Sequence, residues 1–481
     1  MPGYLELPLL ALVASALAGS TAPRTAPHEC CSSTETARID STLADEMRRT
    51  RAPGAAVVVT ESGRVVYERA LGVRSVETRE PMTSRTLVRI GSVTKTATAL
   101  TSAVLAARGT LDLDAPIARY APQLPVPFRR LTMRQLLTHT AGMANEGAGT
   151  GSHDIDALRR RVLGWDASKR LGRAGDIYSY SSPGYWLAGY VLSGATGTEY
   201  ASAVRAALLT PLGMSTATFD PFVAFTYPVA LDHRASGDSV VVLRPFPDDA
   251  STWSSGSLFA SAEELARLAT AIADSGRLDG RRALDPSVIG AVTARQTDVP
   301  GPEGDTCGHA LGLSHCADRG TTVLSHYGFR AGSGAVLTVI PARRAAVVIL
   351  ANGPGAIMHQ TEQTVLDVLL GPQDTAARAR REPIRRVLPA ELVGTFVNGA
   401  DTLTLFTRAD SAFYRYRSGV PQPVRALDDG SVGVLDAQGN VEQTFRLVRG
   451  RSGERYLHDG LTAFRRTARA RASGSAGRST R

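Results

Sequence analysis

Hydrophobic residues recur with two periods along this chain, and the periods separate predicted helices from predicted strands. Ile39, Leu43 and Met47 lie four residues apart and predict an opening helix over residues 35–51. The apolar, β-branched runs at 55–60 and 65–69 are joined by a turn that contains glycine, and they predict a β-hairpin. The chain therefore begins with a helix followed by a hairpin.

The middle of the chain has mainly the helical period, and a second hairpin follows it. Helices are predicted from Ser92 to about residue 109, over 131–140, from 187 after a turn at Pro183-Gly184, over 262–274 and over 360–370. Strands are predicted at 334–340 and 345–351. Strands from both ends of this region have to join one antiparallel sheet with helices on its faces. The predicted fold class is α+β, with a helical subdomain.

The predicted secondary structure changes after residue 372. Residues 373–387 are rich in Pro and Arg and are predicted to be a linker. Residues 388–467 predict a small all-β barrel or sandwich, with strands expected at 403–407, 412–416, 432–435, 444–448 and 456–457. Residues 468–481 have the composition of a disordered tail. The main domain is assigned to residues 30–372.

Composition places the chain among globular proteins. Its 481 residues are 43% hydrophobic and 21% charged, with a formal net charge of +9. The arginines are scattered, and their densest clusters carry no interleaved aromatic residues, so we predict no nucleic-acid partner. Beyond the N-terminus, no stretch reaches the ~18 uninterrupted apolar residues of a membrane-spanning helix. The oligomeric state is left open.

The N-terminus predicts export. Residues 7–18 form a short apolar run that ends in Ala16-Leu17-Ala18, an A-x-A-type cleavage site, and we assign residues 1–26 to a signal peptide. The segment departs from the usual pattern because no Lys or Arg precedes the run and Glu6 lies there. Ser20 stands where a lipoprotein would have its cysteine, so no lipid anchor is predicted. A periplasmic or secreted location follows; the alternative is the N-terminus of a cytosolic protein.

The cysteines fit an exported protein. Cys307 and Cys316 flank a short segment and predict a local disulfide. The alternative is a metal cluster with His309 and His315, but the spacing is not that of a zinc module, so no metal is predicted. The state of the adjacent Cys30 and Cys31 is left open.

The chemistry begins with Ser92 and Lys95. Residues three apart on a helix share a face, so the hydroxyl and the amine can meet. A serine needs a base to become a nucleophile, and a lysine whose pKa is lowered by burial can be that base. The chain has only two lysines among its 54 basic residues, so arginine is used wherever a positive charge is enough. The alternative is that Lys95 is an ordinary surface charge.

Two later segments offer further parts of a site. Tyr180 lies in a hydroxyl-rich turn and can relay a proton as a phenolate, if a cation lowers its pKa; alternatively, it is a packing tyrosine. His326 and Gly328 precede the second hairpin, where glycine lets a substrate backbone approach and histidine can hydrogen-bond or titrate. Alone, His326 is more typical of a surface histidine at a strand end. The G-x-S-x-G, H-E-x-x-H and Walker patterns do not occur in the sequence.

In combination, these motifs resemble the serine β-lactamase and penicillin-binding-protein superfamily. The order Ser92-x-x-Lys95, then Tyr180-Ser181-Ser182, then His326-Tyr327-Gly328 is similar to its S-x-x-K, Y-x-N and K/H-T-G motifs. The resemblance covers about residues 35–372 and is closest to the class C-like branch, with its esterases, D-aminopeptidases and LACTB-like proteins. The sequence segments 108–117, 136–143 and 348–353 also resemble this branch. Residues 388–467 resemble the lipocalin-like modules appended to some of these proteins.

The resemblance implies roles for the matching residues. Ser92 would be acylated, Lys95 and Tyr180 would share the work of a general base, and Tyr180 would return a proton to the leaving group. The backbone N–H groups of Ser92 and Phe329 would form the oxyanion hole, and His326 would face the substrate. No cofactor is implied.

Two positions depart from the family pattern. Ser182 replaces an asparagine whose amide would hold a substrate carbonyl, and the bulky Tyr327 replaces a small threonine. Both departures disfavour β-lactam hydrolysis. We therefore expect an exported serine hydrolase that acts through an acyl-enzyme on small esters, amides or D-amino-acid peptides. The alternatives are a true β-lactamase or D,D-carboxypeptidase and, in a different class, a non-catalytic binding protein that keeps the fold.

Overall fold

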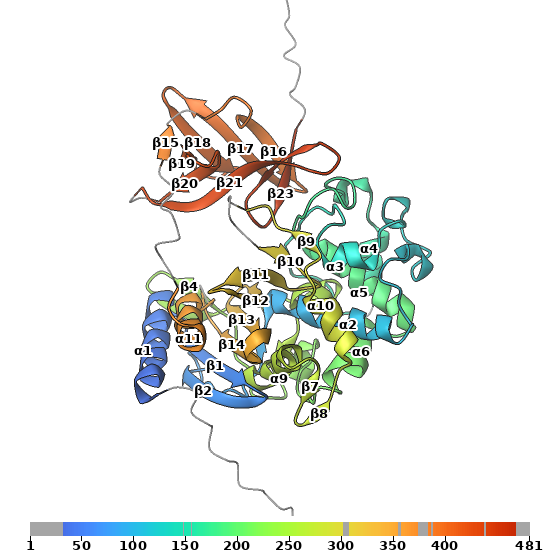
Figure 1. Ribbon diagram of the computed structural model, residues 1–481, viewed down its shortest axis with the longest axis vertical. Helices are drawn as coiled ribbons and strands as arrows, with labels where there is room; N and C mark the ends of the chain where they lie inside the picture. Colours follow the sequence, from blue (N-terminus) through green and yellow to red (C-terminus); the bar gives the residue numbers. More distant parts are fainter. Residues whose placement is uncertain are drawn as a thin grey trace, which may run out of the picture.

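The structure is a computed structural model of the chain and has two domains (Figure 1). It describes residues 32–147, 149–154, 156–301, 307–354, 357–373, 388–436 and 439–467, together with the backbone of 383–385. The predicted signal peptide, Cys30, Cys31 and the predicted tail lie outside the described residues, as does most of the predicted linker. No described helix is long and apolar enough to cross a membrane.

An antiparallel sheet forms the centre of the first domain. Its eight strands follow the order β2-β1-β14-β13-β12-β11-β10-β9. They span β1 (Gly54–Glu61), β2 (Arg64–Gly72), β9 (Thr297–Asp298), β10 (Gly308–His309), β11 (Ser314–Asp318), β12 (Thr321–Arg330), β13 (Ser333–Ile340) and β14 (Ala345–Ala351). β1 pairs with β14 along its whole length, from Ala55 opposite Ala351 to Glu61 opposite Ala345. The N-terminal and C-terminal hairpins thus share one sheet, which confirms the predicted α+β class.

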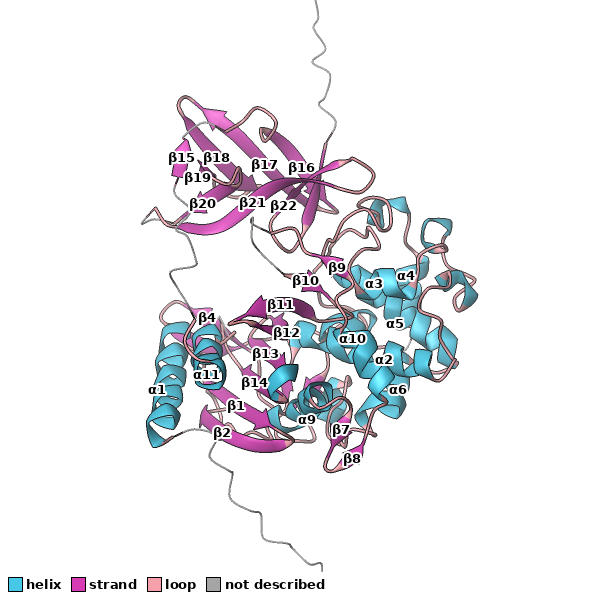
Figure 2. Cartoon of the chain, in the orientation of Figure 1, coloured by secondary structure: helices cyan, strands magenta, loops and turns pink. Residues whose placement is uncertain are grey.

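Helices cover both faces of this sheet (Figure 2). Successive strand residues point to opposite faces, so Val57 packs with α1 (Ser33–Thr50) and α11 (His359–Leu370), while Val58 belongs to the larger core on the other face. That core includes α9 (Ala262–Ala273) and the helical subdomain. The subdomain contains α2 (Thr94–Ala107), α3 (Met133–Leu137), α4 (Ala157–Leu163), α5 (Ser182–Thr196), α6 (Tyr200–Val204), α7 (Pro221–Ala224), α8 (Trp253–Gly256) and α10 (Pro286–Thr293). Short pairs complete the domain: β3 (Val88–Arg89) with β6 (Phe259–Ala260), β4 (His233–Ser236) with β5 (Ser239–Val242), and β7 (Arg277–Leu278) with β8 (Arg281–Arg282).

One helix start differs from the prediction. α5 begins at Ser182, so Pro183 and Gly184 lie in its first turn and not in a turn before it. The Ser181 hydroxyl accepts a hydrogen bond from the Gly184 N–H and caps the helix, and proline is favoured in a first turn because no hydrogen bond is lost there. The prediction was wrong because Pro-Gly was interpreted as a turn without regard to the serine before it.

The C-terminal domain is a closed barrel. Eight strands follow one another around it: β16 (Gly394–Asn398), β17 (Asp401–Arg408), β18 (Ser411–Tyr416), β19 (Gln422–Leu427), β20 (Val432–Leu435), β21 (Val441–Arg449), β22 (Arg455–His458) and β23 (Ala463–Arg466). The pairing of β16 with β23 and of β19 with β20 closes the ring, and β15 (Pro383–Arg385) lies beside β19. The all-β prediction is confirmed, although β16, β19 and β23 were not predicted as strands. Figure 1 shows the barrel beside the β9, β10 and α3 end of the first domain.

Glu46 joins the two outer helices and generates a prediction about stability. Its buried carboxylate on α1 accepts hydrogen bonds from the N–H groups of Gln360 and Thr361, at the start of α11, and from the Thr361 hydroxyl. We expect Glu46→Ala to lower the free energy of unfolding by about 1–3 kcal/mol, because buried N–H donors lose their acceptor. Urea unfolding followed by tryptophan fluorescence will measure this, since Trp165, Trp186 and Trp253 all lie in the first domain.

The exposed neighbour Asp45, which pairs only with Arg48 one helical turn away, provides the control. Asp45→Ala should cost no more than about 0.5 kcal/mol. Equal losses from both substitutions would contradict a capping role for Glu46.

Candidate active site

Ser92 and Lys95 are brought together where a short 3-10 turn runs into a helix. Ser92 lies in the turn Gly91–Val93, and Lys95 lies in the first turn of α2. The Lys95 Nζ is 3.1 Å from the Ser92 Oγ and 2.8 Å from the carbonyl oxygen of Ser255 on α8. The carbonyl accepts one amine hydrogen and so orients the Nζ toward Ser92.

The environment of Lys95 favours a neutral amine. Its side chain is fully buried, and burial lowers its pKa well below the usual value because the charged form loses its hydration. The positive charge of Arg330, at the end of β12, lowers it further. A neutral amine has a lone pair that can accept the Ser92 proton.

Tyr180 completes this group. It lies in the loop before α5, its hydroxyl hydrogen-bonds to the side chain of Ser92, and its ring centre is 4.9 Å from the Lys95 Nζ. Burial raises the pKa of Tyr180, although the bond to Ser92 acts in the opposite direction. A phenolate was expected only if a cation lowered the pKa of Tyr180; burial instead raises this pKa and favours the protonated form. In the protonated form the Tyr180 hydroxyl can donate a proton, and the lowered pKa of Lys95 makes Lys95 the better base.

His326 and Tyr327 are neighbours on β12 but point to opposite faces of the sheet. The His326 ring centre is 6.3 Å from that of Tyr180, and its Nδ1 is 2.9 Å from the Tyr327 carbonyl oxygen, so Nδ1 carries the proton and Nε2 can accept a hydrogen bond. Burial lowers the pKa of His326 to about 3, which makes the ring neutral. The Tyr327 hydroxyl instead donates to Glu362 on α11. The Tyr327 side chain thus packs toward α11, on the face of the sheet opposite to His326.

Gly328 and Phe329 lie against the turn Gly91–Val93, which carries the candidate nucleophile Ser92 and is called the nucleophile turn below. A β-carbon at position 328 would overlap the Ile90 carbonyl oxygen and lie 3.2 Å from the Ser92 backbone nitrogen. A β-carbon at Gly91, whose φ is +53°, would lie 2.7 Å from the Phe329 backbone nitrogen. The two glycines thus let the nitrogens of Ser92 and Phe329 approach the same region, as an oxyanion hole requires. The Phe329 side chain is exposed.

Sequence reasoning missed an amide beside Ser182. The Ser182 N–H donates to the Asn145 Oδ1 at 3.0 Å, so a side-chain carboxamide lies at the start of α5 although position 182 carries none. The signal that could have revealed it is faint, because Asn145 lies 37 residues away in a Gly-rich loop. The local loss of an amide at Ser182 therefore does not leave this part of the site without one.

Two buried histidines behind Tyr180 were also not assigned to the site. The His139 ring centre is 4.4 Å from that of Tyr180 and 5.1 Å from that of His309. His139 Nδ1 accepts the Ser181 N–H, which fixes the start of α5. Burial lowers the pKa of both histidines, that of His309 to about 3.

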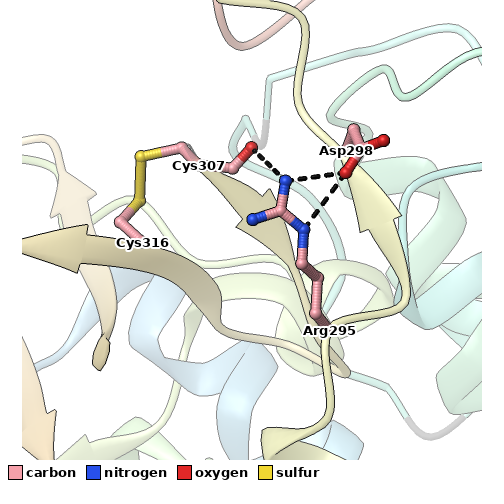
Figure 3. The surroundings of a disulfide bond; sticks show 4 residues. All are labelled: Arg295, Asp298, Cys307 and Cys316. Carbon is pink, nitrogen blue, oxygen red and sulfur yellow. Dashed lines mark hydrogen bonds and ion pairs between the residues drawn. A yellow bond between two sulfur atoms is a disulfide. The ribbon is translucent and has the colours of Figure 1, made fainter. Parts of the chain in front are cut away.

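The disulfide holds His309 in place. Cys307 and Cys316 are joined across β10 and β11, and Arg295 bonds to both Asp298 and the Cys307 carbonyl beside it (Figure 3). Because both sulfurs are in the disulfide, these cysteines are not thiolate ligands. Among the described residues, no group of three or more His, Cys, Asp or Glu side chains is arranged to hold a metal ion.

Comparison with known proteins gives the family. The family model described as Beta-lactamase matches residues 39–370, more than half of the chain. The chain therefore belongs to the β-lactamase family, whose members are serine hydrolases, and the resemblance inferred from the motifs is confirmed.

Individual relatives differ in their names. Penicillin-binding protein 4 of Amycolatopsis lactamdurans is 30% identical over 369 residues, covering 72% of this chain and 93% of its own. Esterase EstB of Burkholderia gladioli is 36% identical over 199 residues, which are 37% of this chain and 50% of the esterase. The chain thus matches only half of the esterase's length.

Solved structures share the fold. The crystal structure of SurE superposes with a TM-score of 0.73 and 25% identity, covering 90% of this chain and 99% of SurE. A class C β-lactamase from Rhodobacter sphaeroides superposes with a TM-score of 0.56 and 23% identity, covering 69% of this chain and 97% of its own.

Gly328 provides a direct test of the site geometry. We expect Gly328→Ala to reduce kcat/KM for any ester substrate at least about 100-fold, because the added methyl group displaces β12 from the nucleophile turn. Gly290 on α10 is the control, since a β-carbon there meets no atom within 4 Å. Gly290→Ala should retain activity. Full activity of Gly328→Ala in a steady-state ester assay would contradict the proposed close approach.

Proposed function

We propose that this protein is an exported serine hydrolase that forms an acyl-enzyme on Ser92 and acts on small esters, amides or D-amino-acid peptides. One observation carries the proposal: the Ser92 hydroxyl lies between a buried amine 3.1 Å away and the hydroxyl of a buried, protonated tyrosine. A serine alone has neither the base nor the acid that acyl transfer requires.

The reaction follows from these protonation states. Neutral Lys95 accepts the Ser92 proton as Oγ attacks the substrate carbonyl, and the N–H groups of Ser92 and Phe329 stabilise the oxyanion. Tyr180 donates its proton to the leaving group and is reprotonated from the Lys95 ammonium. A water molecule then attacks the acyl-enzyme, and the same groups act in reverse to release Ser92.

The substrate class is supported by the comparisons. A structure of SurE contains D-Leu, which supports substrates with a D-amino acid, and the esterase relative supports esters. The penicillin-binding-protein relative keeps a β-lactamase or D,D-carboxypeptidase as the second candidate. The non-catalytic alternative is disfavoured because Ser92, Lys95 and Tyr180 are all in contact.

Export remains a proposal based on the N-terminal apolar run and the Cys307–Cys316 disulfide, a bond typical of oxidising compartments. No nucleic-acid partner or stable membrane anchor is proposed. Turnover of p-nitrophenyl butyrate, D-Ala-p-nitroanilide and nitrocefin will distinguish esterase, aminopeptidase and lactamase. Exclusive turnover of nitrocefin would favour the second candidate.

The two lysines of the chain provide a matched test of the base. We expect Lys95→Arg to abolish labelling of Ser92 by a fluorophosphonate probe, because arginine cannot accept the proton. Lys169→Arg should label like the wild type, since Lys169 only pairs with Glu146 at 32% side-chain exposure. Ser92→Ala should not label. Labelling of Lys95→Arg would remove Lys95 from the mechanism.

The pH dependence follows from the same assignment. The pKa of Lys95 is lowered, so kcat/KM should be full above that pKa and fall as the pH drops through it and the amine becomes protonated. The pKa of Tyr180 is raised, so the loss of its proton should not reduce activity in the neutral range. Because the pKa of His326 lies near 3, His326→Asn should leave the fall of kcat/KM at low pH in the same place. If this fall disappears in His326→Asn, the titrating group is His326 and not Lys95.

A further inference from the structure

The loop that carries Tyr180 is held by both domains. Residues 176–180 have neither helical nor strand structure. The hydrolase domain packs against the rings of Tyr178 and Tyr180 through His139 and accepts the Ser179 N–H at the His139 carbonyl oxygen, at 2.9 Å. Further hydrogen bonds to this loop come from the β21–β22 turn and the β22–β23 hairpin of the barrel.

The β22–β23 hairpin contacts three consecutive residues. The Leu461 carbonyl oxygen accepts the Tyr180 N–H at 2.9 Å, and the Ser179 Oγ accepts the Ala463 N–H at 3.1 Å. His458 Nδ1 accepts the Gly460 N–H, so Nε2 carries the proton and donates to the Tyr178 carbonyl oxygen at 3.0 Å. The backbone of Tyr180 is thus fixed from the barrel side.

The β21–β22 turn holds the other end of the loop through hydrogen bonds to Asp176, which together are called the clasp below. The buried carboxylate of Asp176 accepts hydrogen bonds from the Ser452 hydroxyl at 2.9 Å, the Ser452 N–H, and the Tyr456 hydroxyl at 2.8 Å. The Arg451 N–H donates to the Asp176 carbonyl oxygen at 3.0 Å. These bonds involve both the side chain and the main chain of one residue, which leaves it little freedom.

A second loop is held in the same way. The buried side chain of Asn398 on β16 accepts the Asn145 N–H at 2.6 Å through Oδ1 and donates to the Ala463 carbonyl oxygen at 2.7 Å through Nδ2. Asn145 in turn accepts the Ser182 N–H. The barrel therefore contacts the loops on both sides of the start of α5.

We propose that the C-terminal barrel is a positioning part of the active site, which holds Tyr180 where its hydroxyl can protonate the leaving group. The inference rests on the proposed role of Tyr180. A small displacement of a catalytic group is enough to reduce a rate about 100-fold. The Tyr180 loop has no regular structure of its own, and the Tyr180 N–H is bonded to the barrel, so the barrel contributes to its position.

The leaving group separates this role from a merely structural one. A p-nitrophenolate ion leaves without a proton, whereas an alkoxide needs one from Tyr180. Both esters give the same butyryl-enzyme, so they differ only in acylation, which kcat/KM reports. Loss of Tyr180 positioning should therefore lower kcat/KM for ethyl butyrate and spare that for p-nitrophenyl butyrate. General damage to the fold should lower both rates equally.

The experiment compares four variants of the full chain on these two esters. Tyr180→Phe sets the reference effect. Asp176→Ala removes the clasp from the hydrolase side, and Tyr456→Phe removes one hydrogen bond from the barrel side without disturbing the hydrolase domain. Tyr414→Phe is the control, because Tyr414 packs on Phe445 in the barrel, 5.3 Å between ring centres, and has no described contact with the loop.

We expect Asp176→Ala to lower kcat/KM for ethyl butyrate about 10-fold or more and to leave kcat/KM for p-nitrophenyl butyrate within about 2-fold of the wild type. Tyr456→Phe should show a smaller loss with the same selectivity, and Tyr414→Phe none. Should Asp176→Ala not fold, the selectivity of Tyr456→Phe decides.

Equal losses on both esters, or no loss in either clasp variant, would overturn the inference while the reference effect of Tyr180→Phe stands. Absence of that reference effect would overturn the assigned role of Tyr180 and the inference together. The two failures are thus distinguishable.

Discussion

The burial of one amine is the constraint on which the site depends. The hydrogen-bond partners of Lys95 in the described structure are a hydroxyl and a carbonyl oxygen, and neither is a carboxylate. An ammonium in such a place would lack both water and a counter-ion, which is a costly arrangement. The amine avoids this cost by losing its proton, and the resulting lone pair is what Ser92 needs.

A second buried cation in the same domain shows the opposite solution. The Arg89 guanidinium is as inaccessible to solvent as Lys95, but it forms an ion pair with the buried carboxylate of Asp232. Arginine stays charged in a protein and therefore has to be buried with an anion. Arg89 is thus buried with an anion, which keeps its charge, and Lys95 is buried without one, which favours the neutral amine.

The sequence predicted local features better than the contacts between distant segments. Ser92 and Lys95 are three residues apart, so helical geometry alone brings them together. Whether Tyr180 is protonated depends on burial by several segments, and a motif carries no record of burial. The face of β12 that Tyr327 occupies also could not be predicted, because a residue's size carries no information about it.

The barrel strands were predicted unevenly for related reasons. β17 and β18 contain no proline, whereas Pro423 lies within β19 and disfavours its prediction as a strand. β23 is only four residues long and gains its definition from pairing with β16 and β22. Such strands depend on their neighbours and have a weak signal of their own.

The division of labour between the domains follows from what each kind of backbone can fix. Ser92 and Lys95 lie on a turn and a helix that are buried in one core, so the hydrolase domain holds them without help. Tyr180 has to reach Ser92 from a loop, and a loop needs partners for its backbone groups. The β22–β23 hairpin supplies such a partner through the Leu461 carbonyl oxygen, which any residue at position 461 would present. The contact therefore depends on the path of the backbone and not on the side chain at position 461. For this reason the sequence of the hairpin gives no indication of it.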